Sequence, residues 1–202
     1  NSNCNITGIT YTAVTGLNQT FGNFTWNCAS QTIDQNFPNT GALVISGDLI
    51  ISSTGAGTNQ LVLNQANLSV KNYTQTGGRF NLSNISNTTR TLNVSGNFNL
   101  SAGILTESGT GTAAGAIVFN GSSTQTYSKT GGTISQAINF SVAGGSILDV
   151  GTSVIDGSSG TFILQSGAGI ITAHAQGLST SAGTGSIQVT GTKTFDSGAN
   201  YT

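Results

Sequence analysis

Short apolar runs recur along the whole chain, and stretches rich in Gly, Asn, Ser and Thr separate them. The segment 43–51 (LVISGDLII) matches the segment 92–100 (LNVSGNFNL) position by position. Halfway between them, 68–73 (LSVKNY) repeats the same pattern with one residue deleted. Internal similarity at a fixed spacing indicates a repeat architecture, so the period is the first quantity to establish.

The motif apolar–x–apolar starts at positions 43, 68, 92, 117, 138, 162 and 187, and an earlier member starts at Phe21. A period near 24 suits one coil of a parallel β-helix, in which neighbouring coils pair about 4.8 Å apart. Alternation within the strand turns Leu92, Val94 and Phe98 inward and leaves Asn93 facing water. We expect one parallel core stack with seven members: Leu43, Leu68, Leu92, Ile117, Ile138, Phe162 and Ile187.

The sequence therefore predicts an all-β parallel β-helix (β-solenoid) of about seven or eight right-handed coils, roughly 24 residues each. A single array covers 1–202, with N-terminal coils in 1–42 and repeating coils in 43–202 that we expect to continue beyond the C-terminus or to stack on another subunit. Gly pairs such as Gly131-Gly132 supply positive φ at bends. The alternative is a β-sandwich, which does not require one register over seven repeats.

Composition supports this class. The 29 Gly residues, the absence of Met and the many Ser, Thr and Asn residues weaken helices. Charged residues make up only 5% of the chain, the net charge is −1, and apolar residues reach 36%, so the chain is not of the disordered type. The near-neutral charge without a basic run argues against nucleic acid, and no apolar run is long enough for membrane insertion.

The two cysteines, Cys4 and Cys28, are separated by one period of the repeat. Residues one period apart lie on adjacent coils, where the Cα separation of about 5 Å fits a disulfide. We expect a disulfide that joins the first coil to the second, and with it an oxidising compartment. Two buried free thiols are the alternative.

Catalysis is not expected. Polysaccharide lyases and hydrolases on this fold need clustered carboxylates, yet the acids fall at different offsets within their coils. The close pair Asp149 and Asp156 is interpreted as turn chemistry, because Asp156 precedes a glycine. The six acids are Asp34, Asp48, Glu107, Asp149, Asp156 and Asp196.

No cofactor or metal site is predicted. His174 is the only histidine, and we expect it on the surface or in a turn. Thr-x-Thr pairs begin at Thr10, Thr74, Thr110, Thr124 and Thr192, but a flat ice-binding ladder is interrupted by Leu49 and Phe98. Glycosylation sequons, among them Asn67, Asn72, Asn93 and Asn120, are expected by chance in so Asn-rich a chain.

Four stretches of the chain resemble a known family: 19–28 (QTFGNFTWNC), 92–98 (LNVSGNF), 116–127 (AIVFNGSSTQTY) and 191–201 (GTKTFDSGANY). They are similar to a repeat region in very large secreted surface proteins of Bacteroidetes-type bacteria. Many of those proteins end in a sorting domain for the type IX secretion system. The resemblance implies an extracellular, adhesin-like or filamentous role and supplies no catalytic residues.

The expected function is therefore that of a structural, non-catalytic segment of an extracellular adhesin or self-assembling surface filament, with the chain itself or glycans as partner. The alternative is a carbohydrate-binding module, which exposed stacking aromatics would favour. Its candidates are Trp26, Tyr73, Tyr127 and Tyr201. A polysaccharide-degrading enzyme ranks third.

Overall fold

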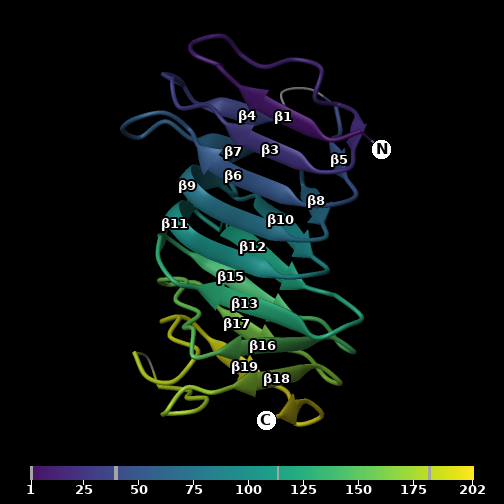
Figure 1. Ribbon diagram of the computed structural model, residues 1–202. Coiled ribbons are helices and arrows are strands. Elements are labelled where there is room, and N and C mark those ends of the chain that lie inside the picture. Colours follow the sequence, from purple (N-terminus) through teal and green to yellow (C-terminus); the bar gives the residue numbers. More distant parts are fainter. Residues whose placement is uncertain (1, 39–40, 113, 182) are drawn as a thin grey trace.

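The structure is a computed structural model that describes residues 2–38, 41–112, 114–181 and 183–202. These residues contain strands and turns but no helix, and every strand pair among them is parallel. The strands stack along one axis into an elongated solenoid with β1 at one end and β18 near the other (Figure 1). The predicted all-β parallel β-helix is thus confirmed.

The strands are short because Gly-, Asn- and Ser-containing turns interrupt each coil after a few residues. Their bounds are β1 (Cys4–Thr7), β2 (Thr20–Phe21), β3 (Phe24–Asn27), β4 (Gln35–Phe37), β5 (Val44–Ile45), β6 (Leu49–Ser53), β7 (Leu61–Leu63), β8 (Asn67–Val70), β9 (Tyr73–Asn81), β10 (Thr89–Val94), β11 (Phe98–Thr106), β12 (Ala114–Phe119), β13 (Gln125–Lys129), β14 (Thr133–Ile134), β15 (Ile138–Val142), β16 (Ile147–Gly151), β17 (Phe162–Leu164), β18 (Gly169–Thr172), β19 (Lys193–Phe195) and β20 (Asn200–Tyr201).

From β8 onward the chain alternates between two parallel sheets. The larger sheet follows the order β1-β3-β6-β9-β11-β13-β16-β18-β20, and a six-stranded sheet follows β8-β10-β12-β15-β17-β19. A third face is formed by β4, β7, the second halves of β9 and β11, and β14, which pair in that sequence. Each coil therefore carries two or three strands.

About six turns place a strand in both sheets, slightly fewer than the seven or eight coils predicted. The difference arises at the ends of the predicted column. Near the N-terminus, Leu43 precedes β5, which pairs with β2 in a separate two-stranded sheet. Near the C-terminus, Ile187 makes an isolated bridge with Ile155 and lies outside the six-stranded sheet.

The register confirms part of the predicted stack and corrects the rest. Leu68, Leu92 and Ile117 are direct partners on adjacent coils. The next position belongs to Phe140, because Ile138 pairs with Gly115. Ile138 and Phe140 are two positions apart on the same strand, so both side chains point to the inner face. The alternation of apolar and polar residues alone therefore does not show which of them is the partner of Ile117.

The column then continues through Phe162 to Lys193 in β19, whereas the sequence pattern had placed Ile187 there. Residues 173–181 and 183–192 lie in turns and loops outside the named strands, so the step from Phe162 to its partner is longer than a standard coil. All seven predicted core residues are nevertheless buried.

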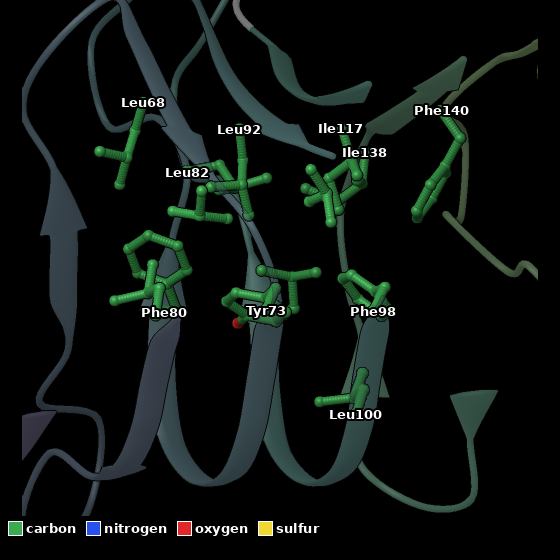
Figure 2. Packing of buried hydrophobic residues seen from close by; sticks show 14 of the residues in the cluster. Leu68, Tyr73, Phe80, Leu82, Leu92, Phe98, Leu100, Ile117, Ile138 and Phe140 are labelled. Atoms are coloured by element: carbon green, nitrogen blue, oxygen red, sulfur yellow. The ribbon is translucent and has the colours of Figure 1, made fainter. Parts of the chain in front are cut away.

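Aromatic rings form a second buried stack beneath the larger sheet. Phe98 lies between Tyr73 and Tyr127, with ring centroids 5.0 Å away on both sides and near-parallel planes. Figure 2 shows Tyr73 and Phe98 on neighbouring coils beside Leu100. Because the three residues are direct register partners, the pairing of the coils also sets the stacking of the rings.

A ladder of Asn and Asp side chains follows the turn that leads into the larger sheet. The Oδ1 atoms of Asn23, Asn72 and Asn97 accept hydrogen bonds from the backbone N–H groups of Asp48, Asn97 and Thr126, each on the next coil. Asn72 also donates through Nδ2 to Oδ1 of Asp48, at 2.7 Å. The ladder satisfies backbone donors at a turn where no strand partner is present.

The glycines before Asp48 and Asn97 leave room for the ladder side chain on the preceding coil. A Cβ atom on Gly47 would lie 2.1 Å from Oδ1 of Asn23, and one on Gly96 would lie 2.3 Å from Oδ1 of Asn72. These separations are far below van der Waals contact, so the Gly-Asx dipeptides at 47–48 and 96–97 are required by the ladder itself.

The predicted disulfide is wrong in this structure, in which Cys4 and Cys28 are both free. Strands β1 and β3 pair Cys4 with Phe24 and Thr7 with Asn27, so the first coil is shorter than the period that the cysteine spacing suggested. Cys28 therefore lies four positions further along the strand than the partner of Cys4, a displacement of about 13 Å. A disulfide needs Cα atoms within about 7 Å.

Candidate functional site

The six acids do not meet at one place, and each has a local structural partner. Oδ1 and Oδ2 of Asp34 accept hydrogen bonds from the backbone and side chain of Gln60, and Asp48 belongs to the ladder. Asp149 and Asp196 each accept a bond from the N–H two residues ahead, as expected for turn-forming aspartates.

Asp156 forms an ion pair with Lys129, with Nζ and Oδ2 3.2 Å apart. The pair lies beside the core ring of Tyr127, whose hydroxyl donates to the backbone carbonyl of Val154. Burial raises the pKa of Tyr127 well above its usual value, and the negative charge of Asp156 adds to the shift. Asp149 therefore forms the turn predicted for it, through its hydrogen bond from the N–H of Gly151. Asp156 was predicted to have the same role, but its side chain pairs with Lys129.

Glu107 is the one buried acid among the described residues, with 5% of its surface exposed. Its Oε2 accepts a hydrogen bond from the N–H of Gly109 at 3.0 Å. Burial raises the pKa of the Glu107 carboxyl, and hydrogen bonds from the backbone of Ala137 and Gly109 oppose that shift. The carboxylate acts here as a cap for the turn after β11.

His174 begins a turn, because its carbonyl accepts from the N–H of Gly177 and its Nδ1 accepts from the N–H of Gln176. This agrees with the turn position predicted for it. Within the described ranges, no three His, Cys, Asp or Glu residues gather as a metal site would require. In the same ranges, no helix is long and apolar enough to cross a membrane.

Three of the four aromatic residues considered for glycan stacking lie inside the solenoid. Trp26, Tyr73 and Tyr127 are almost completely buried, and Nε1 of Trp26 donates to Oε1 of the buried Gln31. Only Tyr201, with 47% of its surface exposed, faces solvent. The inward position of these rings follows from the strand alternation that also buries their neighbours.

The Thr-x-Thr pairs do not form a ladder. Thr74 lies on β9, where its register partners are Ile50 and Asn99, while the pair at Thr192 leads into β19 in the other sheet. A ladder is interrupted, as predicted, but by Ile50 and Asn99. Leu49 and Phe98, the residues expected to interrupt it, are register partners of Tyr73.

A groove of about 260 Å³ crosses the outer side of the six-stranded sheet at its N-terminal end. We call it the Lys71 groove. It spans four consecutive coils and is lined by Ile45, Ser46, Ser69, Val70, Lys71, Asn93, Ser95 and Asn120.

Two columns of polar side chains form the Lys71 groove. Ser69 and Asn93 are direct register partners on β8 and β10. Lys71, Ser95 and Asn120 each follow directly after one of the paired residues Val70, Val94 and Phe119, so they form a second column across three coils. The N–H groups of Ser95 and Asn120 donate to the carbonyls of Val70 and Val94, which fixes this second column.

Several polar side chains in the Lys71 groove have no partner in the part of the chain that the structure describes. Among the described residues, the Lys71 ammonium group has no ion-pair or hydrogen-bond partner. The same holds for the side chains of Ser69, Asn93 and Asn120. The sequence pattern did not single out this surface, because Ser and Asn occur throughout the chain and the groove appears only when the register is known.

Comparison of the chain with protein-family models, with curated proteins and with solved structures finds no match.

Proposed function

We propose that the chain is a structural, non-catalytic segment of an extracellular adhesin or surface filament. The observation that carries this proposal is the uninterrupted sheet from β1 to β20, in which every coil is hydrogen-bonded to the next. A stack of this kind gains length with each added coil and transmits load through the same ladder of bonds. It is the property that a stalk or fibre requires.

The surface chemistry suits exposure outside a cell. Charged residues are only 5% of the chain, so Asn, Ser and Thr provide its solubility. The resemblance to repeats of secreted bacterial surface proteins supports the same location. The free cysteines give no support to an oxidising compartment.

Antibody labelling of intact source cells tests the location. We expect an antiserum against the chain to label unpermeabilised cells, and external protease to remove the signal. Labelling that appears only after permeabilisation would contradict a surface role. A parallel screen of polysaccharide hydrolysis tests the non-catalytic part, since sustained product release by the purified chain would assign an enzyme.

The partner that we propose for the ends of the sheet is a second copy of the chain. The N–H groups of Asn200 and Thr202 bond inward to Ala168 and Ile170, so the alternating backbone groups of Tyr201 between them point away from the stack. Strand β1 has the opposite edge of the same sheet. In the 202-residue chain taken by itself, head-to-tail contact between these two edges would repeat without closing and would produce a fibre.

Sedimentation of the purified chain over a concentration series tests this association. We expect mass to grow with concentration, and Tyr201→Pro, which removes the N–H at the edge, to suppress the growth. Tyr11→Ala serves as control, because Tyr11 is also exposed but lies outside the strands. A chain that stays monomeric at high concentration, or a Tyr201→Pro variant that still assembles, would exclude this contact.

A further inference from the structure

The Lys71 groove combines polar side chains of three kinds in a regular arrangement. Hydroxyl groups come from Ser69 and Ser95, carboxamides from Asn93 and Asn120, and one ammonium group from Lys71. Because the residues are on successive coils, the groups repeat about 4.8 Å apart along the axis of the solenoid. The groove therefore offers an extended row of sites rather than one compact pocket.

We propose that the Lys71 groove binds an acidic oligosaccharide lying along the solenoid axis. Hydroxyl and carboxamide groups both donate and accept hydrogen bonds, as the hydroxyl groups of a sugar do. The unpaired Lys71 ammonium provides a charge-assisted contact for a carboxylate or sulfate group on the ligand. This assignment is independent of the structural role proposed above.

Other extended ligands fit the groove less well. A peptide that adds as a strand needs an open sheet edge, but β10 in the groove is already paired on both sides by β8 and β12. At the outer side of β8, the end strand of this sheet, β5 packs alongside and the N–H of Lys71 donates to the carbonyl of Gly47. The apolar lining residues Ile45 and Val70 are buried, so they offer no pockets for alternating side chains. Nucleic acid would require several cations along the groove, and Lys71 is the one basic residue lining it.

Binding is measured by calorimetry with four probes: tetragalacturonate, a mannuronate hexamer, a chondroitin sulfate tetrasaccharide and sialyllactose. We expect saturable binding of at least one acidic probe, weakened by added salt. Where a uronate binds, its methyl ester should bind more weakly, since esterification removes the charge and leaves the sugar backbone unchanged. Failure of all four acidic probes to bind would overturn the proposal.

Variants connect any binding to the groove. Lys71→Gln should weaken binding about tenfold, the loss expected for one charge-assisted hydrogen bond. Ser69→Trp should abolish it by filling the groove, and Asn93→Asp should weaken it by placing a negative charge beside Lys71. The matched control is Lys193→Gln, which removes one positive charge from β19, away from the groove.

Circular dichroism and the denaturation midpoint establish that each variant is folded. Because Asn93→Asp changes an outer-face position without added bulk, it keeps the test valid if Ser69→Trp fails to fold. An acidic probe that binds equally well to the wild type, Lys71→Gln and Asn93→Asp would overturn the assignment to this groove. A loss of binding in Lys193→Gln equal to that in Lys71→Gln would also overturn it.

Discussion

The side-chain oxygen Oδ1 of Asn72 accepts a hydrogen bond from the backbone N–H of Asn97, 2.7 Å away on the next coil. The Nδ2 group of the same residue donates to Oδ1 of Asp48 on the coil before, also at 2.7 Å. Asn72 thus connects three successive coils through one side chain. Contacts of this kind couple neighbouring repeats and determine how cooperatively a solenoid unfolds.

Replacing Asn72 with Ala should lower the free energy of unfolding by about 2 kcal/mol, because it removes two hydrogen bonds, one of them to a carboxylate. Chemical denaturation followed by circular dichroism measures the change. The matched control is Asn93→Ala on the outer face, which has no side-chain partner among the described residues and should change stability by less than about 0.5 kcal/mol. Equal stability of both variants would show that the ladder contributes little.

The ring stack makes a separate prediction. Phe98 contacts Tyr73 and Tyr127 at centroid distances of 5.0 Å and is fully buried. Phe98→Ala should destabilise the chain by about 3–5 kcal/mol through the cavity and the lost ring contacts. Tyr11→Ala, at a site with 73% of its surface exposed, should be close to neutral in the same denaturation experiment. A small loss for Phe98→Ala would mean that neighbouring coils collapse into the space.

Burial raises the pKa of both Tyr73 and Tyr127 well above the usual tyrosine value. The neutral phenol is the form that the folded state favours, so the stabilisation is fully present below the unfolded pKa of about 10 and is lost as pH rises through the folded value. We expect both residues to ionise only when the chain unfolds in alkali. Tyrosinate absorbance recorded alongside circular dichroism tests this, and ionisation of all four tyrosines before loss of structure would contradict it.

The cysteines provide a direct test of the register in the first coil. Cys28 is fully buried and Cys4 partly exposed, and burial raises the pKa of both thiols. After unfolding without reductant, mass spectrometry should find two alkylated thiols per chain. In the folded chain Cys4 should react faster than Cys28. A single cross-linked species would restore the disulfide and require Cys28, in place of Phe24, to lie opposite Cys4.

The repeat itself was predictable because a coil must match its neighbours. Leu68, Leu92 and Ile117 keep the same apolar–x–apolar pattern at nearly equal spacing, and they are direct partners in the sheet. The choice between Ile138 and Phe140 was not predictable, since both point inward from one strand. At the C-terminal end the pattern does not predict the partner of Phe162, because the charged Lys193 occupies a position where the pattern requires an apolar residue.

The candidate surface was less predictable than the fold. The Lys71 groove depends on which Ser and Asn residues lie side by side, and that follows only from the exact register. The Asx ladder did leave a signal in the sequence, namely a Gly-Asx dipeptide directly before an apolar run at 22–23, 47–48 and 96–97. At positions 47 and 96 the glycine is needed because the side chain of the ladder residue on the preceding coil occupies the space that a Cβ would fill. The ladder residue Asn72 follows Lys71, so the dipeptide does not mark every member.

That steric relationship gives the last prediction. Gly96→Ala should destabilise the chain by more than about 2 kcal/mol, since the new methyl group would lie 2.3 Å from Oδ1 of Asn72 and 2.8 Å from the carbonyl of Lys71. Gly57→Ala is the control, because Gly57 has open space around it but a positive φ, which costs about 1 kcal/mol.

A double-mutant cycle then identifies the clash. Asn72→Ala removes the nearer of the two obstructing atoms, so Gly96→Ala should cost less in that background than in the wild type. The carbonyl of Lys71 remains, so we expect partial and not complete relief. Strict additivity of the two losses would show that Gly96 is required for a reason other than the ladder, since two residues that share one space must be coupled in their free energies.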